Sequence, residues 1–337
     1  MKEQQNIEEM QQLINQEAQR QPQLEADNEI DFKELIFAIW QGKLTIIITT
    51  IIAAIIGVVY ALSLPDIYKS EVLLAPAEES KGGGMAGLAS QFGGLASIAG
   101  INLGGTGADK ATIALEIIRG KVFVAEFINS HNLKATIMAT NGWDPTSNKL
   151  MYNTETYNPE TKTWLREVKA PQQAEPSDLE VHGRFTRGNL SISSDKDTGL
   201  VTLSIKHYSP YVAKNIVEKL VVAINEKLQA DDISEANKSI EYLQNALNKS
   251  PIADMQKVFY QLIEQQEQTK MLASVRDQYV LKIINPAVVE EKKTGPKRAL
   301  ICILSVMLGG MLSVVIVLIR FRFFIGKDSN NVNANLS

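Results

Sequence analysis

Two glycine-rich segments are the first places in this 337-residue chain where chemistry could be encoded. Gly82–Gly87 (GGGMAG) satisfies the G-x-G-x-x-G spacing by which a dinucleotide fold brings pyrophosphate to a helix N-terminus. No strand–helix–strand pattern surrounds it, and six more glycines follow with no helix to point at a phosphate. Gly104–Thr112 (GGTGADKAT) resembles a phosphate-binding loop, but no glycine stands directly before Lys110. We therefore predict no nucleotide site and no other cofactor site.

Residues that could serve as nucleophiles, bases or metal ligands are scattered. No carboxylate or cysteine stands at ligand spacing from any histidine, which predicts no metal site; the histidines are His131, His182 and His207. No G-x-S-x-G elbow is present to activate a serine. Glu264 and Glu267 lie one helical turn apart and could form the carboxylate pair of a glycan hydrolase, but two acids on an exposed helix are usually solvated. We predict no catalytic residues and no enzyme.

Two long apolar segments define how the chain is organised. Leu44–Leu64 and Ala299–Ile319 are each 21 residues without a charge, which at 1.5 Å per residue is enough to cross a bilayer core of about 30 Å. A buried core helix rarely has so long an apolar run. The two spans place both termini on one side of the membrane and residues 65–298 on the other, although the Lys and Arg residues beside them do not decide which side. The net charge of −4 argues against a nucleic-acid partner.

Small residues recur every four positions inside both spans. At this spacing helix backbones can approach closely, so packing drives helix association. We expect the two sets to face each other or a neighbouring chain; they are Ala53, Gly57 and Ala61 in the first span, and Ser305, Gly309 and Ser313 in the second.

The segment after the first span reads as a mixture of helices and strands. Its alternating or helical spacing predicts a strand at Tyr68–Leu74, two short helices over Ala111–Leu133 broken at Gly120, a β-hairpin of Asn189–Ser194 and Leu200–Lys206 around the turn DKDTG, and a helix from Ser209-Pro210 to Leu228. Gly82–Gly107 holds 10 of the 21 glycines and predicts a loop. Thr140–Asp178, rich in Asn, Thr and Pro, is also typical of a loop.

Ile233–Leu281 is the longest helical stretch of the chain. Pro251 breaks it, and Ser250 can cap the second piece. The second piece would be about 30 residues and about 45 Å long, more than a compact domain needs, so we expect it to project and to pack on other copies of the chain. Ile283–Val289 can return as a strand beside Tyr68–Leu74, which would bring the two spans together.

Five segments taken together resemble the polysaccharide co-polymerases, the Wzz-type chain-length determinants of bacterial surface polysaccharides. The resemblance extends from Ile30 to Arg322, and no one motif carries it alone. The segments are IDFKELIFAIWQGK entering the first span, LPDIYKSEVLLAP leaving it, SPYVAKNIVEKLVVAINEKL, YQLIEQQEQTKMLASVRDQYVLKIINPAV, and GPKRALICILSVMLGG entering the second span.

The resemblance implies a fold and a topology. The expected class is α+β, with two transmembrane helices flanking a periplasmic α/β base domain that carries long projecting helices, and with both termini in the cytoplasm. The expected parts are a tail with an interfacial helix (1–43), a span (44–64), the base domain (65–230) with its glycine-rich loop (82–107), the projecting segment (231–282), a return strand and proline-containing linker (283–298), a second span (299–319) and a tail (320–337). The proline-rich entry to the second span, a feature of the family, maps onto Pro286 and Pro296.

The resemblance also implies a function. Such proteins form homo-oligomeric rings in the bacterial inner membrane and set the modal length of a polymer, here O-antigen-type lipopolysaccharide. They have no catalytic activity of their own, and their partners are a membrane polymerase that extends undecaprenyl-linked repeats and the growing polysaccharide or its undecaprenyl-linked form. The residues expected to carry this role on the projecting helix are Leu262, Glu264, Glu267 and Leu272.

One departure narrows the class within the family. In the capsule-export branch a tyrosine autokinase domain commonly follows the second span, whereas this sequence ends 18 residues after Ile319. We therefore expect the kinase-less O-antigen type. The alternative is a structural or export subunit for a capsular or exopolysaccharide.

Overall fold

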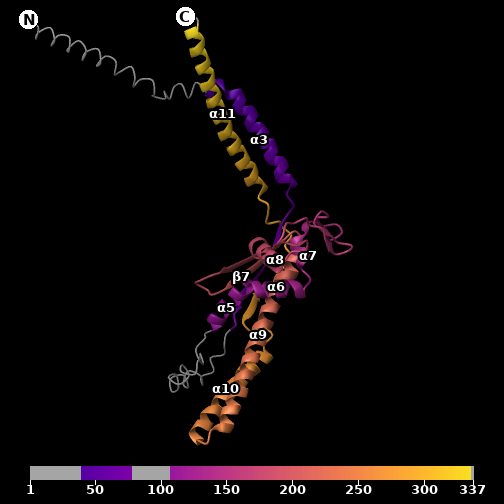
Figure 1. Ribbon diagram of the computed structural model, residues 1–337, viewed down its shortest axis with the longest axis vertical. Coiled ribbons are helices and arrows are strands. Elements are labelled where there is room, and N and C mark those ends of the chain that lie inside the picture. Colours follow the sequence, from indigo (N-terminus) through magenta and orange to yellow (C-terminus); the bar gives the residue numbers. More distant parts are fainter. Residues whose placement is uncertain (1–38, 78–106, 335–337) are drawn as a thin grey trace, which may run out of the picture. The chain divides into compact units, whose positions relative to one another are not determined.

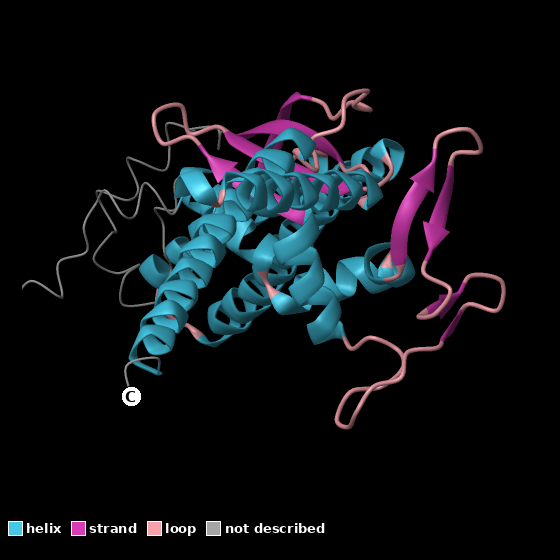
Figure 2. Cartoon of the chain, turned by 90° about the horizontal axis from the view of Figure 1, so that it is seen from above, coloured by secondary structure: helices cyan, strands magenta, loops and turns pink. Residues whose placement is uncertain are grey.

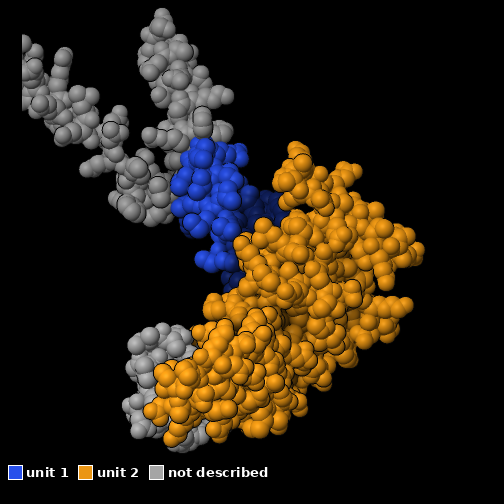
Figure 3. All heavy atoms as spheres, turned by 60° about the horizontal axis from the view of Figure 1, so that its bottom comes forward, with its two compact units in different colours: residues 1–64, 297–337 blue, residues 65–296 orange. Residues whose placement is uncertain are grey.

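The computed structural model describes residues 39–77 and 107–334, with side chains up to Arg320. The expected interfacial helix Ile30–Trp40 and the glycine-rich loop 82–107 lie outside the described residues except at their ends. The chain divides into two units, residues 1–64 with 297–337 and residues 65–296, which are coloured separately in Figure 3. The expected mixture of helices and sheet, with long helices and two helices of membrane length, is confirmed.

The first unit contains two helices that are long and apolar enough to cross a membrane. They are α3 (Lys43–Ser63) and α11 (Arg298–Ala334), and they pack against each other (Figure 1). Most of their large apolar side chains are exposed, as expected where lipid rather than protein surrounds a helix. Both apolar runs predicted from the sequence are therefore helical, with ends that differ from the prediction by a residue, while α11 continues well past Ile319.

A four-stranded antiparallel sheet forms the centre of the second unit. Its strand order is β6 (Leu190–Ser194), β7 (Val201–His207), β1 (Tyr68–Pro76) and β8 (Leu281–Asn285). The turn between β6 and β7 is closed by the Asp195 carboxylate, whose Oδ1 accepts from the backbone N–H of Asp197 at 2.9 Å, and Gly199 supplies the required positive φ of 69°. The return strand predicted beside the first strand is confirmed, because β8 pairs with β1.

Helices cover one face of this sheet and build the core with it. They are α5 (Gly107–Arg119), α6 (Lys121–Ser130), α7 (Lys134–Met138), α8 (Asp178–Arg184), the π-helical turn η1 (Phe185–Asn189) and the first half of α9 (Pro210–Lys249). The break predicted at Gly120 separates α5 from α6, and Ser209 caps α9 by accepting from the Val212 N–H at 3.4 Å. Fully buried side chains from both layers meet in the core, among them Leu74, Ile118, Leu203, Ile205, Phe185, Leu220 and Ile224.

The segment between α7 and α8 is not the plain loop that the sequence predicted. It contains two strand pairs, β2 (Thr140–Asp144) with β3 (Lys149–Tyr152) and β4 (Tyr157–Asn158) with β5 (Thr163–Trp164), which lie apart from the main sheet in Figure 2. Aromatic rings hold them: Tyr157 lies 5.6 Å from Tyr152 and 4.8 Å from Trp164, centroid to centroid. The prediction weighed the turn-forming residues and overlooked these aromatic side chains.

The long helical region differs from the prediction in three ways. The helix expected to end at Leu228 is continuous with the next one, so α9 has 40 residues and residue 230 falls inside it. The break at Pro251 is confirmed, but α10 (Ala253–Val275) has 23 residues instead of about 30. Ser250 ends α9 and does not cap α10, whose N-cap position is occupied by Ile252 without a side-chain hydrogen bond. Residues 229–234 contain no glycine or proline, so nothing in them stops α9.

Candidate functional site

The residues that could do chemistry have structural partners instead. The His182 Nε2 lies 2.8 Å from the Arg119 carbonyl, and the His131 Nδ1 lies 2.9 Å from the Phe127 carbonyl. His207 is buried; its Nε2 donates to the Thr136 carbonyl at 3.2 Å and its Nδ1 accepts from the Ser209 N–H at 3.1 Å. Burial lowers the pKa of His207, which fits a neutral ring in this position. Within residues 39–77 and 107–334, no three His, Cys, Asp or Glu side chains gather as a metal site.

The glycine-rich motifs contribute little to the described structure. Gly82–Gly87 lies outside the described residues. Lys110, which the phosphate-loop comparison singled out, is on α5, where its Nζ lies 3.2 Å from the Asp232 carboxylate of α9 and 5.6 Å from the centre of the Tyr279 ring. Its ammonium group therefore joins three segments of the second unit.

The small residues of the two spans lie at the α3–α11 contact. A Cβ on Gly57 would collide with Ser305, and a Cβ on Gly309 would collide with Ala53. Ala61 and Ser313 are buried as well. The hydroxyls do not bridge the helices: Ser305 donates to the Cys302 carbonyl at 2.8 Å and Ser313 to the Gly310 carbonyl at 2.6 Å, each on its own helix. These small side chains permit the close backbone approach seen at this contact.

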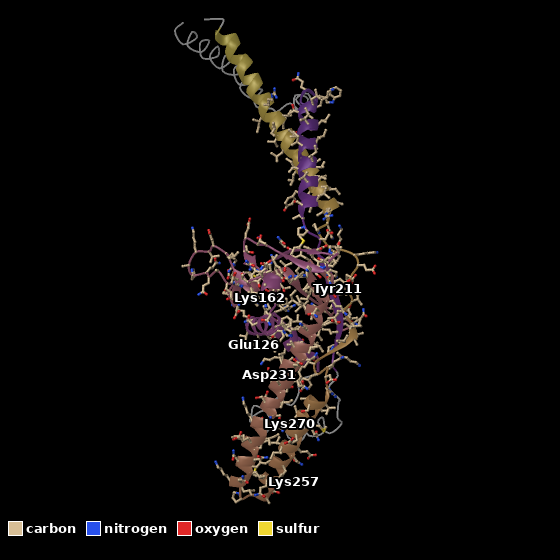
Figure 4. All side chains as sticks on the ribbon, turned by 90° about the vertical axis from the view of Figure 1, so that its right-hand side faces the viewer. Glu126, Lys162, Tyr211, Asp231, Lys257 and Lys270 are labelled. Carbon is tan, nitrogen blue, oxygen red and sulfur yellow. The ribbon has the colours of Figure 1, made fainter. Side chains whose placement is uncertain are left out.

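The most prominent surface of the second unit is a helical hairpin, defined here as residues 230–249 of α9 together with α10. Figure 1 shows both helices extending side by side away from the sheet, and Figure 4 marks Lys257 and Lys270 along them. Its interior is narrow, with Ala236, Ile240 and Leu243 of α9 and Ala273 of α10 buried.

Large apolar and aromatic side chains cover the outside of this hairpin. Tyr242 is 73% exposed and Val275 is 76% exposed, although both are of types that usually bury most of their area. Others with exposure above a third are Met255, Tyr260, Met271 and Leu272, together with Ile252 in the connection between the two helices. An exposed set of this kind is typical of surfaces that bind another protein.

A buried amide fixes the base of the hairpin to the sheet. Asn225 is 3% exposed; its Oδ1 accepts from the N–H groups of Val280 and Leu281 at 2.8 and 3.0 Å, and its Nδ2 donates to the carbonyls of Leu281 and Val221. One side chain of α9 therefore satisfies the backbone at the start of β8, where the chain returns from α10.

A second link between α9 and the returning chain lies one to two helical turns beyond Asn225. The Tyr279 hydroxyl donates to the Asp232 carboxylate at 2.5 Å, and the Gln229 amide donates to the Ala273 carbonyl. Burial, reinforced by this bond to Asp232, raises the pKa of Tyr279 to about 12. Asn225, Asp232 and Tyr279 were missed by sequence reasoning. Only Asn225 left a signal, as a polar residue beside the apolar stripe of α9.

The residues predicted on the projecting helix are spread along α10. Glu264 and Glu267 are exposed, Leu262 is half-buried, and Leu272 is 37% exposed. No carboxylate cluster forms around the two glutamates in the described part of the chain. Pro286 directly follows β8, and Pro296 follows Gly295, whose carbonyl accepts from the Ile67 N–H at 2.8 Å. The segment that follows α3 and the segment that precedes α11 are therefore paired near these prolines.

Comparison with known proteins places these features in a family. The model described as "Wzz: Chain length determinant protein" matches residues 28–131, and the model described as "GNVR: G-rich domain on putative tyrosine kinase" matches residues 249–322. Together they cover more than half of the chain, and each includes one of the membrane-length helices. No curated protein matches the chain.

Two solved structures are similar. A full-length bacterial polysaccharide co-polymerase has 15% identity and a TM-score of 0.35, over 88% of this chain and 98% of its own. A fragment of WzzB, the polysaccharide co-polymerase from Salmonella Typhimurium, has 12% identity and a TM-score of 0.27, over 68% of this chain and 100% of its own. The family models confirm the resemblance found in the sequence, which is to the Wzz chain length determinants.

Proposed function

We propose that this chain regulates the length of an O-antigen-type lipopolysaccharide as a ring-forming co-polymerase without catalytic activity of its own. Its partner would be the inner-membrane polymerase that extends undecaprenyl-linked repeats, and its ligand the growing chain or its lipid-linked form. Determination of chain length is the role of the family. The observation that carries the proposal for this chain is the helical hairpin with its exposed apolar side chains.

The hairpin supports assembly into a ring for a physical reason. Water penalises each exposed apolar side chain by about 25 cal/mol per Å², so a row of them on a rigid helix pair is stabilised by contact with an equivalent surface. A contact that repeats head to tail between identical chains closes into a ring when the rotation per subunit allows it. We further propose that residues 1–43 and 320–337 are cytoplasmic and that residues 65–298 are periplasmic.

We propose that the small residues of α3 and α11 hold the two spans together within one chain. Gly309→Leu would force the helices apart, because even a Cβ at this position collides with Ala53. We expect this variant to lower the thermal stability of the purified protein in nanodiscs, and Gly310→Leu to leave it unchanged, because no atom lies within 4 Å of a Cβ there. Equal stability of the two variants would contradict this role of the small residues.

A second function has one specific observation in its favour. The GNVR model that matches residues 249–322 is described as a domain on tyrosine kinases, which points to the branch that serves capsule or exopolysaccharide export. In that case the chain would be a structural or export subunit of a capsular polysaccharide system.

Deletion of the gene, followed by its restoration, separates the two functions. Surface polysaccharide from each strain is resolved on a gel. For a length regulator, deletion turns a clustered ladder into a broad distribution and restoration recovers the cluster. For an export subunit, the polymer disappears from the surface altogether.

A further inference from the structure

A cavity of about 310 Å³ lies at the sheet end of α9, away from the helical hairpin. Its walls come from three places: Thr136 of α7, Asn148 and Leu150 of the β2–β3 pair, and Tyr211 and Asn215 of the first turns of α9. Figure 4 shows Tyr211 at this end of the helix. The volume is at the lower limit of the range of about 300–1,000 Å³ that small-molecule sites occupy.

The walls are held in place by side-chain contacts. The imidazole of His207 donates to the Thr136 carbonyl and accepts from the Ser209 N–H, so it ties α7 to the start of α9. On the other side Trp143 donates from Nε1 to the Asn148 Oδ1 at 2.9 Å, and its ring lies 6.0 Å from that of Tyr211. A site with fixed walls loses little entropy when a ligand enters it.

The chemistry of the lining is neutral and amphipathic. None of the nine lining residues carries a charge at neutral pH. Leu133 and Ile216 are buried and make an apolar floor, while the Tyr211 ring is 51% exposed. In the described part of the chain the Asn148 NH₂ group and the whole Asn215 amide have no protein hydrogen-bond partner, so donors and an acceptor are available at the rim.

These properties select the kind of ligand. A phosphate or an acidic group needs cationic or multiple backbone donors, which this lining does not offer. A sugar ring presents apolar C–H groups on one face and hydroxyls around its edge, which match an aromatic face with amides beside it. We propose that this cavity is a subsite for one neutral sugar residue of the polysaccharide. The proposal rests on the function above for the identity of the polymer.

The test uses the full-length chain in lipid nanodiscs. The probe is an oligosaccharide of a few repeat units, released from the surface polymer of the source bacterium, and binding is followed by saturation-transfer-difference NMR and by tryptophan fluorescence. We expect saturable binding with transfer to the sugar ring protons, and no binding of inorganic pyrophosphate.

Four variants locate the site. Tyr211→Ala should weaken binding at least about tenfold by removing the stacking surface, whereas Tyr211→Phe should change it less than about twofold. Asn148→Gly should weaken binding about threefold; glycine suits the positive φ of 52° at this position, so the fold is preserved. Leu179→Ala, which removes an exposed side chain of α8 that does not line the cavity, should leave binding unchanged.

Three results would overturn the subsite. They are absence of saturable binding by the unmodified chain, affinities of the Tyr211→Ala and Asn148→Gly variants equal to that of the unmodified chain, and binding of pyrophosphate in place of the oligosaccharide. These results are distinguishable from a failure of the proposed function. If deletion of the gene broadens the polymer lengths while the chain binds no oligosaccharide, the length regulator stands and only the subsite falls.

Discussion

The two halves of α9 differ in how far their apolar side chains are buried, although they form one continuous helix. In residues 210–225 most apolar side chains turn inward, and Ile216, Leu220 and Ile224 are fully buried against the sheet. In residues 230–249 only Ala236, Ile240 and Leu243 are buried, while Tyr242 lies in the open. The apolar side chains of the first half are explained by the fold of one chain, whereas those of the second half are not.

This difference shows where to look for function. Side chains that complete a core are accounted for by stability, so their identity says little about partners. Large apolar side chains that remain exposed on a rigid helix pair gain nothing within one chain, and we propose that contact with another molecule explains them. The comparison therefore separates variants that should unfold the protein from variants that should only change what it assembles with.

The largest effect is expected from truncation in the buried half of α9. Leu220→Ala removes a fully buried side chain and should lower the free energy of unfolding by about 2–5 kcal/mol. The matched change in the exposed half, Tyr242→Ala, should alter it by less than about 0.5 kcal/mol. Chemical denaturation followed by circular dichroism measures both. Similar losses in the two variants would abolish the distinction between the halves.

A somewhat smaller effect is expected at the junction between the two halves. Asn225→Ala leaves the buried N–H groups of Val280 and Leu281 without an acceptor, which should cost about 2–3 kcal/mol. Hydrogen exchange of these two amides should become faster in the variant than in the unmodified protein. Unchanged exchange would mean that Asn225 does not anchor the return from α10.

The smallest effect concerns pH. Because burial lowers the pKa of His207 below its usual 6.5, the unfolded chain binds more protons than the folded chain once the pH falls below about 6.5. The stability that the neutral His207 ring contributes to the folded chain is therefore complete above pH 6.5. It is lost as the pH falls through the lower, folded-state pKa of His207. A protonated Nδ1 would also face the Ser209 N–H without an acceptor.

Replacement of this histidine isolates its contribution. His207→Gln should be less stable than the unmodified protein at pH 7.5, and the difference between the two should shrink at pH 5. A difference that is the same at both pH values would show that His207 does not titrate on unfolding.

Much of the fold could be predicted from local patterns in the sequence. The alternation in Leu200–Lys206 and the turn after Ser194 predicted β6 and β7, and the uninterrupted apolar runs predicted α3 and the first part of α11. These features depend on neighbours a few residues apart, so a single sequence displays them.

Other features depend on residues that are far apart in the chain. Asn225 bonds backbone groups 55 and 56 positions away, and Lys110, Asp232 and Tyr279 meet from three segments. The continuity of α9 was also missed, because the polar stretch at residues 229–234 was taken as a gap between two helices when it is a continuous part of one. The family resemblance supplied the function that none of these local patterns could indicate.

We propose that the exposed apolar residues of the helical hairpin, not its acidic ones, set polymer length through contacts between chains. We would restore the deletion strain with Tyr242→Ala plus Val275→Ala in one case and with Glu264→Gln plus Glu267→Gln in the other, at matched protein levels, and compare the polysaccharide ladders. We expect a shifted or broadened cluster for the first pair, together with a smaller assembly by mass photometry in nanodiscs, and an unchanged cluster for the second. An unchanged cluster and an unchanged assembly for the first pair would contradict this proposal.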